Sequence, residues 1–343
     1  MKRNKNLFPK LLGDFLSVYL PSQRGYSKNT ISSYCDAFKL LLQYFECEKK
    51  LHSNQITFNH LDVACITDFM DWLKETRKSS NATVNQRLAG IHSFFKYVQR
   101  IRPELMSRCN EILAIQFQKA YLPAISYLSQ EDVKLILSIP DTSKKSGRRD
   151  NALLWLLYDT GCRVQEVVDL KVSSLRLEPP AQVRLCGKGN KTRVVPLMSG
   201  TAKILKSYLS ENNLGEAHTL QYPLFTNQRN EPLTRAGVAY ILKKYESMAS
   251  LRSTTISPNI SPHMIRHSKA MHLLEAGVNI VYIRDILGHV DISTTEIYAK
   301  SNLEMKRKAL EKAAIINEDS ATPHWVKDEN LLSWLGNFSK SLN

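Results

Sequence analysis

The sequence has little of what membrane proteins, secreted proteins and nucleotide-binding enzymes need. No apolar run approaches the roughly 18 residues of a membrane-spanning helix, and the basic start MKRNKNLFPK is not followed by the apolar stretch of an export signal. The six cysteines are scattered without a C-x-x-C pair, which favours free thiols over disulfides or a structural zinc site. Neither a glycine-rich phosphate loop nor a dinucleotide fingerprint is present. We therefore expect a cytoplasmic protein that does not enter a membrane.

Negative charge is also scarce. The 343 residues include 32 acidic and 47 basic side chains, which gives a formal net charge of +15. This excess is larger than a soluble domain needs, and it is typical of proteins that bind a polyanion. A chain of this length also exceeds one ordinary core and suggests two domains. The composition therefore predicts a two-domain protein whose partner is nucleic acid.

The first part of the chain, residues 1–118, reads as helices joined by short connections. Ser27 is the expected N-cap of a helix in YSKNTISSYCDAFKLLLQYFECEKK. A later helix, ATVNQRLAGIHSFFKYVQR, has an apolar face formed by Leu88, Ile91, Phe95 and Val98. The opposite faces are polar and basic, although such a face is usually just solvated.

The periodicity weakens around Pro123, and we expect an interdomain linker at residues 119–127. Helices resume after the N-cap Ser129, and an apolar helix ends at Gly161. The segment AQVRLCGKGNKTRVVPL breaks the helical pattern and predicts a β-hairpin that turns at Gly189-Asn190. The expected fold class is therefore mainly α with a small β-hairpin or sheet, so that residues 128–314 form an α+β domain.

Two basic clusters in this second part could do chemistry, and each has a simpler explanation. In TGCRVQEVVDL, Arg163 and Glu166 stand three residues apart on one helix face, where a surface ion pair alone would explain them. At the hairpin tip stand Lys188, Lys191 and Arg193, which alone would indicate a solvated turn.

Two further clusters contain histidines. In SPHMIRHSKAMHLLEAGV, a helix start with the N-cap Ser261 carries His263, Arg266 and His267. The four-residue histidine spacing is that of a zinc-binding helix, but the glutamate expected beside the first histidine is absent, so metal binding is weakly supported. In LGHVDISTTEIYAK, Tyr298 follows the histidine at 289 by nine residues, which could also be an accident of a helical surface.

Together these residue types suit the chemistry of a phosphodiester. Two guanidinium groups can hold its non-bridging oxygens and neutralise the charge that develops on them. A tyrosine hydroxyl can attack phosphorus and form a covalent intermediate. A lysine or histidine can protonate the departing oxygen. With so many fixed cations, we expect neither a metal ion nor another cofactor.

The order of the motifs resembles that of the tyrosine recombinases, or phage integrase family. The chain contains T-G-x-R-x-x-E, a G-K-G-x-K hairpin, H-x-x-R-H, L-G-H and a tyrosine nine residues later. Each motif is weak alone, but the shared order is hard to obtain by chance. The resemblance implies a two-domain C-shaped clamp around DNA. In it, residues 1–118 form a SAM-like core-binding domain and 128–314 the catalytic domain. The family gives least guidance for the tail 315–343, where DENLLSWLGNFSK has an apolar set formed by Leu331, Leu332, Trp334, Leu335 and Phe338. These residues favour a last helix that packs on its own domain, and the alternative is a segment that docks on a neighbouring protomer or a companion protein.

The resemblance also implies roles for individual residues. Its catalytic set matches Arg163, Lys188, His263, Arg266, His289 and the nucleophile Tyr298. Lys188 matches the general acid, with Lys191 as the fallback, while Glu166 and His267 match supporting positions. We expect DNA contacts from Lys28, Asn29, Gln86, Arg87, Lys96 and Arg193.

The implied reaction is site-specific recombination for integration, excision or resolution of DNA elements. Tyrosine attack gives a 3′-phosphotyrosyl link and a free 5′-hydroxyl, and a partner strand reverses the step through a Holliday junction. The implied partners are double-stranded DNA, three further protomers in a tetramer on DNA (monomer or dimer when free) and companion recombinases, in the bacterial nucleoid. A helix in NLEMKRKALEKAA would dock on the neighbouring protomer. The alternatives are a type IB topoisomerase and a DNA-binding protein that only organises an element end.

Overall fold

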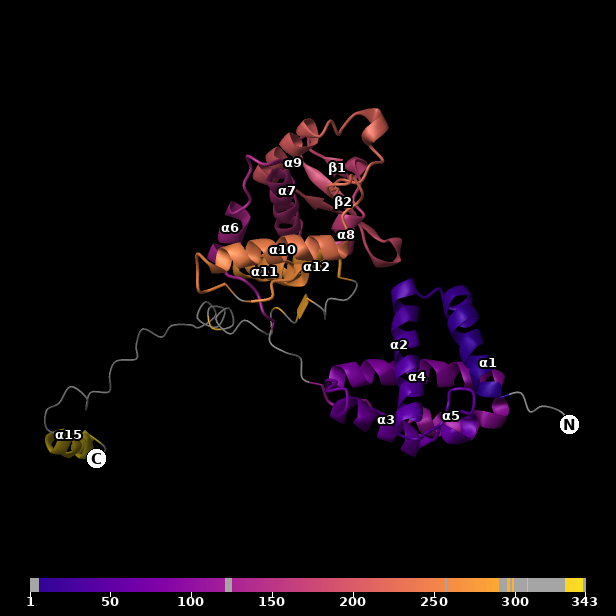
Figure 1. Cartoon of the computed structure of the whole chain (residues 1–343). Helices are drawn as coiled ribbons and strands as arrows, with labels where there is room; N and C mark the ends of the chain where they lie inside the picture. Colours follow the sequence, from indigo (N-terminus) through magenta and orange to yellow (C-terminus); the bar gives the residue numbers. More distant parts are fainter. Residues whose placement is uncertain are drawn as a thin grey trace. The chain divides into compact units, whose positions relative to one another are not determined.

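The computed structural model describes residues 6–120, 125–256, 258–289, 295–296, 298, 307 and 331–341, without the side chains of Lys188, Leu331, Leu332 and Gly336. The chain divides into two compact units, Met1–Pro123 and Ala124–Asn343, and each has its own hydrophobic core. Figure 1 shows the elements of both units. The predicted fold class is confirmed, because the described chain is mainly helical with one small antiparallel sheet.

The first unit consists of helices only in the part that the structure describes. They are α1 (Leu7–Asp14), the π-helical η1 (Phe15–Gln23), α2 (Lys28–Cys47), η2 (Phe58–His60), α3 (Val63–Glu75), α4 (Asn81–Ile101), η3 (Pro103–Leu105) and α5 (Met106–Leu113). The predicted N-cap Ser27 is confirmed, since its side chain accepts from the Thr30 amide. The predicted apolar face of α4 is confirmed too, because Leu88, Ile91, Phe95 and Val98 are all buried.

The second unit contains the remaining elements. They are α6 (Gln130–Ser138), α7 (Lys145–Thr160), α8 (Val164–Val168), η4 (Val172–Ser174), β1 (Leu175–Arg176), β2 (Gln182–Cys186), η5 (Lys188–Asn190), β3 (Thr192–Pro196), α9 (Ser199–Glu211), η6 (Ala217–Thr219), α10 (Arg235–Ser250), α11 (Pro262–Glu275), α12 (Ile280–Leu287) and α15 (Leu331–Ser341). Ser129 and Ser261 cap α6 and α11 as predicted. Both caps satisfy an amide that the first helical turn leaves without an intrahelical partner.

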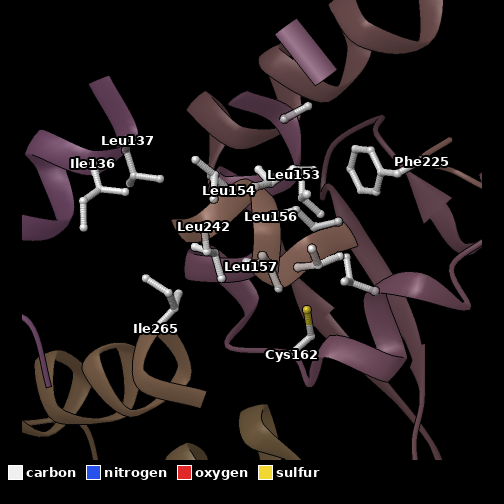
Figure 2. Close-up of a cluster of buried hydrophobic side chains, with 14 of the residues drawn as sticks. Ile136, Leu137, Leu153, Leu154, Leu156, Leu157, Cys162, Phe225, Leu242 and Ile265 are labelled. Atoms are coloured by element: carbon white, nitrogen blue, oxygen red, sulfur yellow. The ribbon is translucent and has the colours of Figure 1, made fainter. Parts of the chain in front are cut away.

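The core of the second unit surrounds α7, whose leucines Leu153, Leu156 and Leu157 are at most 1% exposed. Figure 2 shows them beside apolar side chains of α6, α10 and α11. Burying such a side chain contributes about 1.5–3 kcal/mol. This core holds α7 and α11 together, and therefore fixes the positions of Gly161 at the end of α7 and of the first turns of α11.

The sheet has the strand order β1-β2-β3, with both pairs antiparallel. The β2–β3 pair confirms the predicted hairpin, and its register places Leu185 opposite Arg193. Gly189 and Asn190 have positive φ angles of 75° and 59° in the connecting turn, the conformation that these residue types tolerate best.

Several predictions fall on other parts of the chain. Three predicted segments lie wholly or partly outside the described residues. They are the middle of the predicted linker (121–124), the helix expected in NLEMKRKALEKAA (except Arg307) and most of the tail. Within the described residues, no helix combines the length and the apolar character that crossing a membrane requires.

Candidate active site

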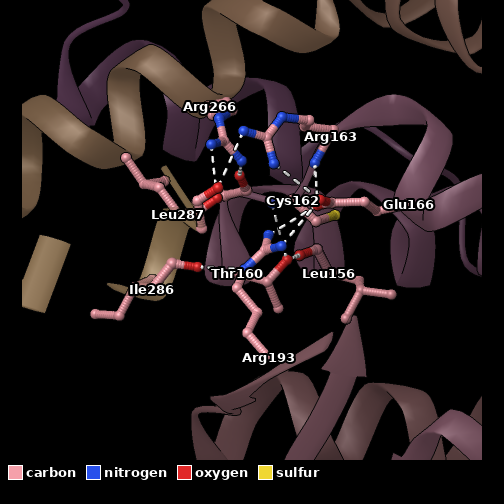
Figure 3. A network of polar contacts seen from close by, with 11 residues as sticks. Leu156, Thr160, Cys162, Arg163, Glu166, Arg193, Arg266, Ile286 and Leu287 are labelled. Atoms are coloured by element: carbon pink, nitrogen blue, oxygen red, sulfur yellow. Dashed lines mark hydrogen bonds and ion pairs between the residues drawn. The ribbon is translucent and has the colours of Figure 1, made fainter. Parts of the chain in front are cut away.

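The C-terminal end of α12 is the point at which three arginines from different elements meet. The carbonyl oxygens of Ile286, Leu287 and Gly288 accept hydrogen bonds from Arg193 (2.8 Å), Arg266 (2.7 Å) and Arg163 (3.2 Å), respectively. A helix end leaves such carbonyls without intrahelical partners and carries a partial negative charge. The helix end therefore orients three guanidinium groups, which Figure 3 shows converging around Leu287 and Glu166.

Arg163 is held at the start of α8 by Glu166, three residues along the chain. Its amide donates to Glu166 Oε2 at 2.8 Å, and its Nη1 donates to Oε1 at 3.0 Å. The Arg163 side chain remains 34% exposed, whereas that of Glu166 is 3% exposed. The pair is therefore a half-buried arginine anchored on a buried carboxylate, rather than the surface ion pair that the dipeptide alone would suggest.

Arg193 binds the same carboxylate from the opposite side. Its Nη1 and Nη2 donate to Glu166 Oε1 and Oε2 at 2.9 and 2.7 Å. Burial alone would raise the pKa of Glu166, but the hydrogen bonds from Arg193 and Arg163 outweigh burial and hold the pKa below its usual range. The carboxylate is therefore ionised, and it fixes two cations at once.

This position differs from the exposed hairpin tip that the sequence suggested for Arg193. The residue lies within β3 rather than in the turn, and its side chain is only 13% exposed. The physical reason is strand alternation, because Arg193 shares the inward face of β3 with the buried Val195. The DNA contact predicted for Arg193 stays a prediction, while its observed partners are Glu166 and Ile286.

Arg266 is the most buried of the three arginines, at 4% exposure. Its Nη1 donates to the Gly161 carbonyl and its Nη2 to the Leu287 carbonyl, both at 2.7 Å. Burial, followed by the nearby positive charge of Arg163, lowers the pKa of Arg266 to about 10. The guanidinium therefore stays protonated at neutral pH, in surroundings that contain more positive than negative charge.

Two glycines allow these close approaches. Gly161 ends α7 with a φ of +57°, and a Cβ there would lie 2.8 Å from Leu287 Cδ2. Gly288 ends α12 with a φ of +66°, and a Cβ there would lie 2.7 Å from Arg193 Nη1. Both the left-handed backbone and the contact disfavour any side chain. This explains why T-G and L-G precede the functional residues in the two motifs.

Tyr298 lies in a neighbouring apolar cluster and is 3% exposed. Its hydroxyl forms a 2.8 Å hydrogen bond with His267 Nδ1, and its ring lies nearly parallel to that of His289, with the centroids 6.3 Å apart. Burial raises the pKa of Tyr298, although the charges of Arg266 and Arg163 counteract part of this rise. The phenol is therefore neutral at physiological pH and lies within the electrostatic reach of two arginines.

His289 is also uncharged. Its Nδ1 forms a 2.8 Å hydrogen bond with Thr295. Burial, together with the charges of Arg266, Arg163 and Arg193, lowers the pKa of His289 to about 4. The neighbouring His267 has a lowered pKa for similar reasons, namely burial and then the proximity of His263 and Arg266. The structure thus brings three arginines, two neutral histidines and a neutral tyrosine together.

An open cleft of about 500 Å³ borders this cluster. Its lining residues are Arg163, Gly187, Lys191, Thr192, Arg193, Arg284, Asp285, Gly288 and His289. Among the lining residues that the structure describes, cations predominate and Asp285 is the one carboxylate. Its shape and charge suit a phosphate group of an extended ligand.

The remaining predicted residues take different positions. His263 is exposed at the start of α11, with its ring centroid 6.5 Å from that of His267. The backbone of Lys188 lies in the hairpin turn, but its side chain is outside the described part. Within the described residues, no group of three or more histidine, cysteine or acidic side chains could hold a metal ion.

The residues predicted to contact DNA from the first unit lie on α2 and α4. Lys28, Asn29, Gln86 and Lys96 are exposed. Arg87 is half-buried and donates to the Ser33 carbonyl at 3.1 Å, so it also joins α4 to α2.

Sequence reasoning missed two contacts of the site. Nothing in the sequence singled out Thr295 as the partner of His289, and the contact between His267 and Tyr298 spans 31 residues. For Arg193, the sequence contained one signal of its inward direction, namely the alternation of side chains along a strand, which places Arg193 on the same face as Val195.

Comparisons with known proteins agree with this architecture. Residues 126–305 match the model of the phage integrase family, and residues 14–101 match the N-terminal SAM-like domain of phage integrases. The putative integrase/recombinase y4rC of Sinorhizobium fredii is 35% identical over 98% of this chain and 99% of its own length. The tyrosine recombinase XerD of Oceanobacillus iheyensis is 37% identical over 82% of this chain and 90% of its own length.

Solved structures share the fold. A XerH site-specific recombinase bound to a palindromic difH substrate aligns with a TM-score of 0.65 and 24% identity over 85% of this chain and 81% of that one. The Tn1549 transposon integrase in complex with transposon right end DNA aligns with a TM-score of 0.67 and 16% identity, covering 87% and 98%.

Proposed function

This chain belongs to the phage integrase family of tyrosine recombinases, and we propose that it cuts and rejoins DNA through a 3′-phosphotyrosyl intermediate on Tyr298. It is a site-specific recombinase, an enzyme that breaks and rejoins DNA strands. The observation that carries the assignment of residues is the excess of positive charge beside a neutral tyrosine. Glu166 is the buried carboxylate that binds Arg163 and Arg193, whereas Arg266 bonds to backbone carbonyls. The three positive charges therefore exceed the negative charge beside them, and a phosphodiester would supply the missing anion.

The arginines would act on the scissile phosphate. Arg163 and Arg266 each donate some of their N–H groups to backbone carbonyls. Because a guanidinium has five N–H groups in all, others remain available. The remaining donors can bind the non-bridging oxygens and stabilise the charge that develops on them. Because these groups are fixed before DNA arrives, little reorganisation accompanies the reaction.

The covalent step would proceed by in-line displacement. The Tyr298 oxygen forms a bond to phosphorus while the bond from phosphorus to the 5′-oxygen breaks. Lys188 would protonate that oxygen as it leaves, with Lys191 as the fallback, and His263 and His289 would bind the phosphate. The phosphotyrosyl link conserves the energy of the broken bond. We therefore propose that neither a nucleotide nor a metal ion is required.

Both domains, residues 1–118 and 128–314 with the linker 119–127 between them in the chain, would contact the DNA. Lys28, Asn29, Gln86, Arg87 and Lys96 are the proposed contacts of the first unit, and Arg193 remains a candidate in the second. Two strand exchanges through a Holliday junction need four protomers, so we propose a tetramer on DNA and a monomer or dimer when free. Companion recombinases can replace some protomers. The setting would be the bacterial cytoplasm, on nucleoid DNA.

The tail 315–343 would dock on a neighbouring protomer or a companion protein. Leu335 and Phe338 of α15 are 48% and 49% exposed, and Phe338 stacks on Trp334 with the ring centroids 5.2 Å apart. Exposed apolar faces of this kind favour an interface. Truncation after Asn317 should abolish recombination and retain first-strand cleavage. Normal recombination by the truncated chain, or general instability, would contradict the docking role.

The assignment of the nucleophile is tested with Tyr298→Phe. The target site is first obtained by sequencing DNA that is trapped covalently on the wild-type enzyme in cells. A nicked suicide substrate with this site should then form a covalent adduct with the wild type and none with the phenylalanine variant. The variant should bind the same duplex with unchanged affinity, because only one oxygen is lost. An adduct formed by the variant would overturn the assignment. Relaxation of a plasmid without strand exchange would instead indicate a topoisomerase.

A further inference from the structure

We propose that His267 is a catalytic residue that accepts the proton of Tyr298 during cleavage and returns it during rejoining. This inference rests on the proposed function, because it takes Tyr298 as the nucleophile. The observation behind it is the direct hydrogen bond of 2.8 Å between His267 Nδ1 and the Tyr298 hydroxyl. A general base must lie within about 2.6–3.2 Å of the proton that it removes.

The other histidine near Tyr298 is occupied differently. The Nδ1 atom of His289 is bonded to Thr295, and this histidine lines the cationic cleft, where a phosphate would bind. His267 lies on α11 next to Arg266 and is not among the residues that line the cleft. The two histidines are therefore suited to different partners, His289 to the phosphate and His267 to the nucleophile.

The surroundings of His267 favour the form that can accept a proton. His263 and Arg266 face it from its own helix, and Tyr298 and His289 face it from the segments packed against α11. Burial, followed by the proximity of His263 and Arg266, lowers the pKa of His267 below its usual value of 6.5. The imidazole is thus neutral at physiological pH. With its proton on Nε2, the Nδ1 lone pair accepts the phenol proton.

The proton balance of the step is complete. During cleavage, Tyr298 Oη bonds to phosphorus, its proton moves to His267 Nδ1, and the 5′-oxygen leaves with its electron pair and takes a proton from the proposed general acid Lys188. During rejoining, the incoming 5′-hydroxyl gives its proton back to the now neutral amine of Lys188 and its oxygen bonds to phosphorus, while the bond from phosphorus to Tyr298 Oη breaks and the imidazolium of His267 protonates the departing tyrosine oxygen. The same residue is therefore base in one direction and acid in the other.

The first test is cleavage of a suicide substrate by His267→Gln, which keeps hydrogen-bonding groups but cannot take a proton. At pH 7 the rate should fall about 10²-fold, within the usual range for general acid–base catalysis. Between pH 7 and 9 the wild-type rate should stay flat, whereas the variant rate should rise about tenfold per pH unit, because hydroxide then ionises Tyr298. Added imidazole should restore part of the activity. A rate within about twofold of the wild type, or a faster rate, would show that the bond only restrains Tyr298 and would overturn the proposal.

A loss of rate that is uniform with pH and not rescued by imidazole would indicate a structural role and would likewise overturn the proposal.

A second measurement separates the loss of proton transfer from any change in the geometry of the site. An oligonucleotide ending in a 3′-(4-nitrophenyl) phosphate is joined to a 5′-hydroxyl strand by the Tyr298→Phe enzyme, with nitrophenolate leaving unprotonated. The double variant H267Q/Y298F should join it as fast as Y298F. A further loss in the double variant would contradict a proton-transfer role.

The two proposals fail in different ways. A covalent adduct on Tyr298→Phe overturns the nucleophile and the role of His267 together. If Tyr298→Phe gives no adduct and His267→Gln cleaves normally, only the role of His267 is overturned.

Discussion

The arginines of the site and its tyrosine lie in opposite environments. Arg163, Arg193 and Arg266 are tied by charged hydrogen bonds to Glu166 and to the carbonyls that end α12. Tyr298, in contrast, is buried among apolar side chains contributed by α11 and α12, and its hydroxyl bonds to His267. The arginine side of the site (Arg163, Arg193 and Arg266) is therefore charged and held by many hydrogen bonds, whereas the tyrosine side (Tyr298 and His267) is neutral.

This difference separates two tasks of the enzyme. The arginine side provides fixed positive charge before the phosphate arrives, which is the form of electrostatic stabilisation that requires least rearrangement. In the proposed mechanism, the tyrosine side holds the nucleophile, which stays unreactive until its proton is removed. Changes on the arginine side should therefore lower the rate equally at every pH, whereas changes on the tyrosine side should alter its pH dependence.

The largest decrease in rate is expected for Lys188, the proposed proton donor to the leaving 5′-oxygen, which belongs to neither the arginine side nor the tyrosine side. Lys188→Ala should slow cleavage by about 10²–10⁴ on an ordinary substrate. It should have much less effect on a 5′-bridging phosphorothiolate, because sulfur leaves without a proton. Rescue of Lys191→Ala instead would move the role three residues along, and rescue of neither would remove the hairpin from proton transfer.

On the arginine side, Arg163→Lys and Arg266→Lys should each reduce cleavage by about 10²–10³. A lysine carries the charge but cannot reproduce the planar fork that binds carbonyls and phosphate together. The loss should be the same from pH 7 to 9. The matched control is Arg284→Lys, since Arg284 lines the same cleft but bonds to Asp285. Near-normal cleavage by either of the first two variants would contradict the clamp.

A smaller effect is expected for Arg193→Lys, because this residue would position Arg163 through Glu166. Loss of one charged hydrogen bond, about 1.5–3 kcal/mol, predicts a decrease in cleavage of about 10–100-fold, with unchanged DNA affinity. The charge-removing variant Arg193→Gln tests the alternative of a phosphate contact. If Arg193 contacts a phosphate, this variant should reduce the magnitude of the slope of log K against log salt by about 0.9. The salt dependence of binding therefore distinguishes the positioning role from the DNA contact.

The smallest effect concerns the pH dependence of stability. The folded-state pKa of Glu166 lies below its value in the unfolded chain, so its contribution is fully present above the unfolded pKa of about 4.3 and is lost as the pH falls through the folded pKa. Hydrogen-exchange protection of α8 and β3, corrected for intrinsic rates, should therefore fall below about pH 4 in the wild type. Glu166→Gln should be less protected at pH 7 and nearly independent of pH in this range. Parallel pH profiles would contradict the ionised carboxylate.

Much of this arrangement was accessible from the sequence. The N-caps Ser27, Ser129 and Ser261 and the hairpin at Gly189-Asn190 follow from local rules, and the structure confirms them. The order of the motifs identified the family, because the motifs lie on several helices and strands but together supply the residue types that one reaction needs.

What could not be predicted depends on backbone atoms and on tertiary contacts. The carbonyls of Ile286, Leu287 and Gly288 orient the arginines, but any residue type supplies a carbonyl, so no side chain in the sequence marks them. The contact between His267 and Tyr298 depends on how two distant segments pack. The family resemblance implies a supporting role for His267, whereas the proton-transfer role proposed above depends on this contact.

The central claim is that Tyr298 attacks a phosphate held by the arginine side of the site. The most direct measurement is to digest the covalent complex of the wild-type enzyme with its cleaved DNA and to identify the nucleotide-bearing peptide by mass spectrometry. We predict one modified residue, Tyr298, linked to the 3′-phosphate of the cleaved strand. A nucleotide on any other residue, or a link to the 5′ end of the break, would contradict the account.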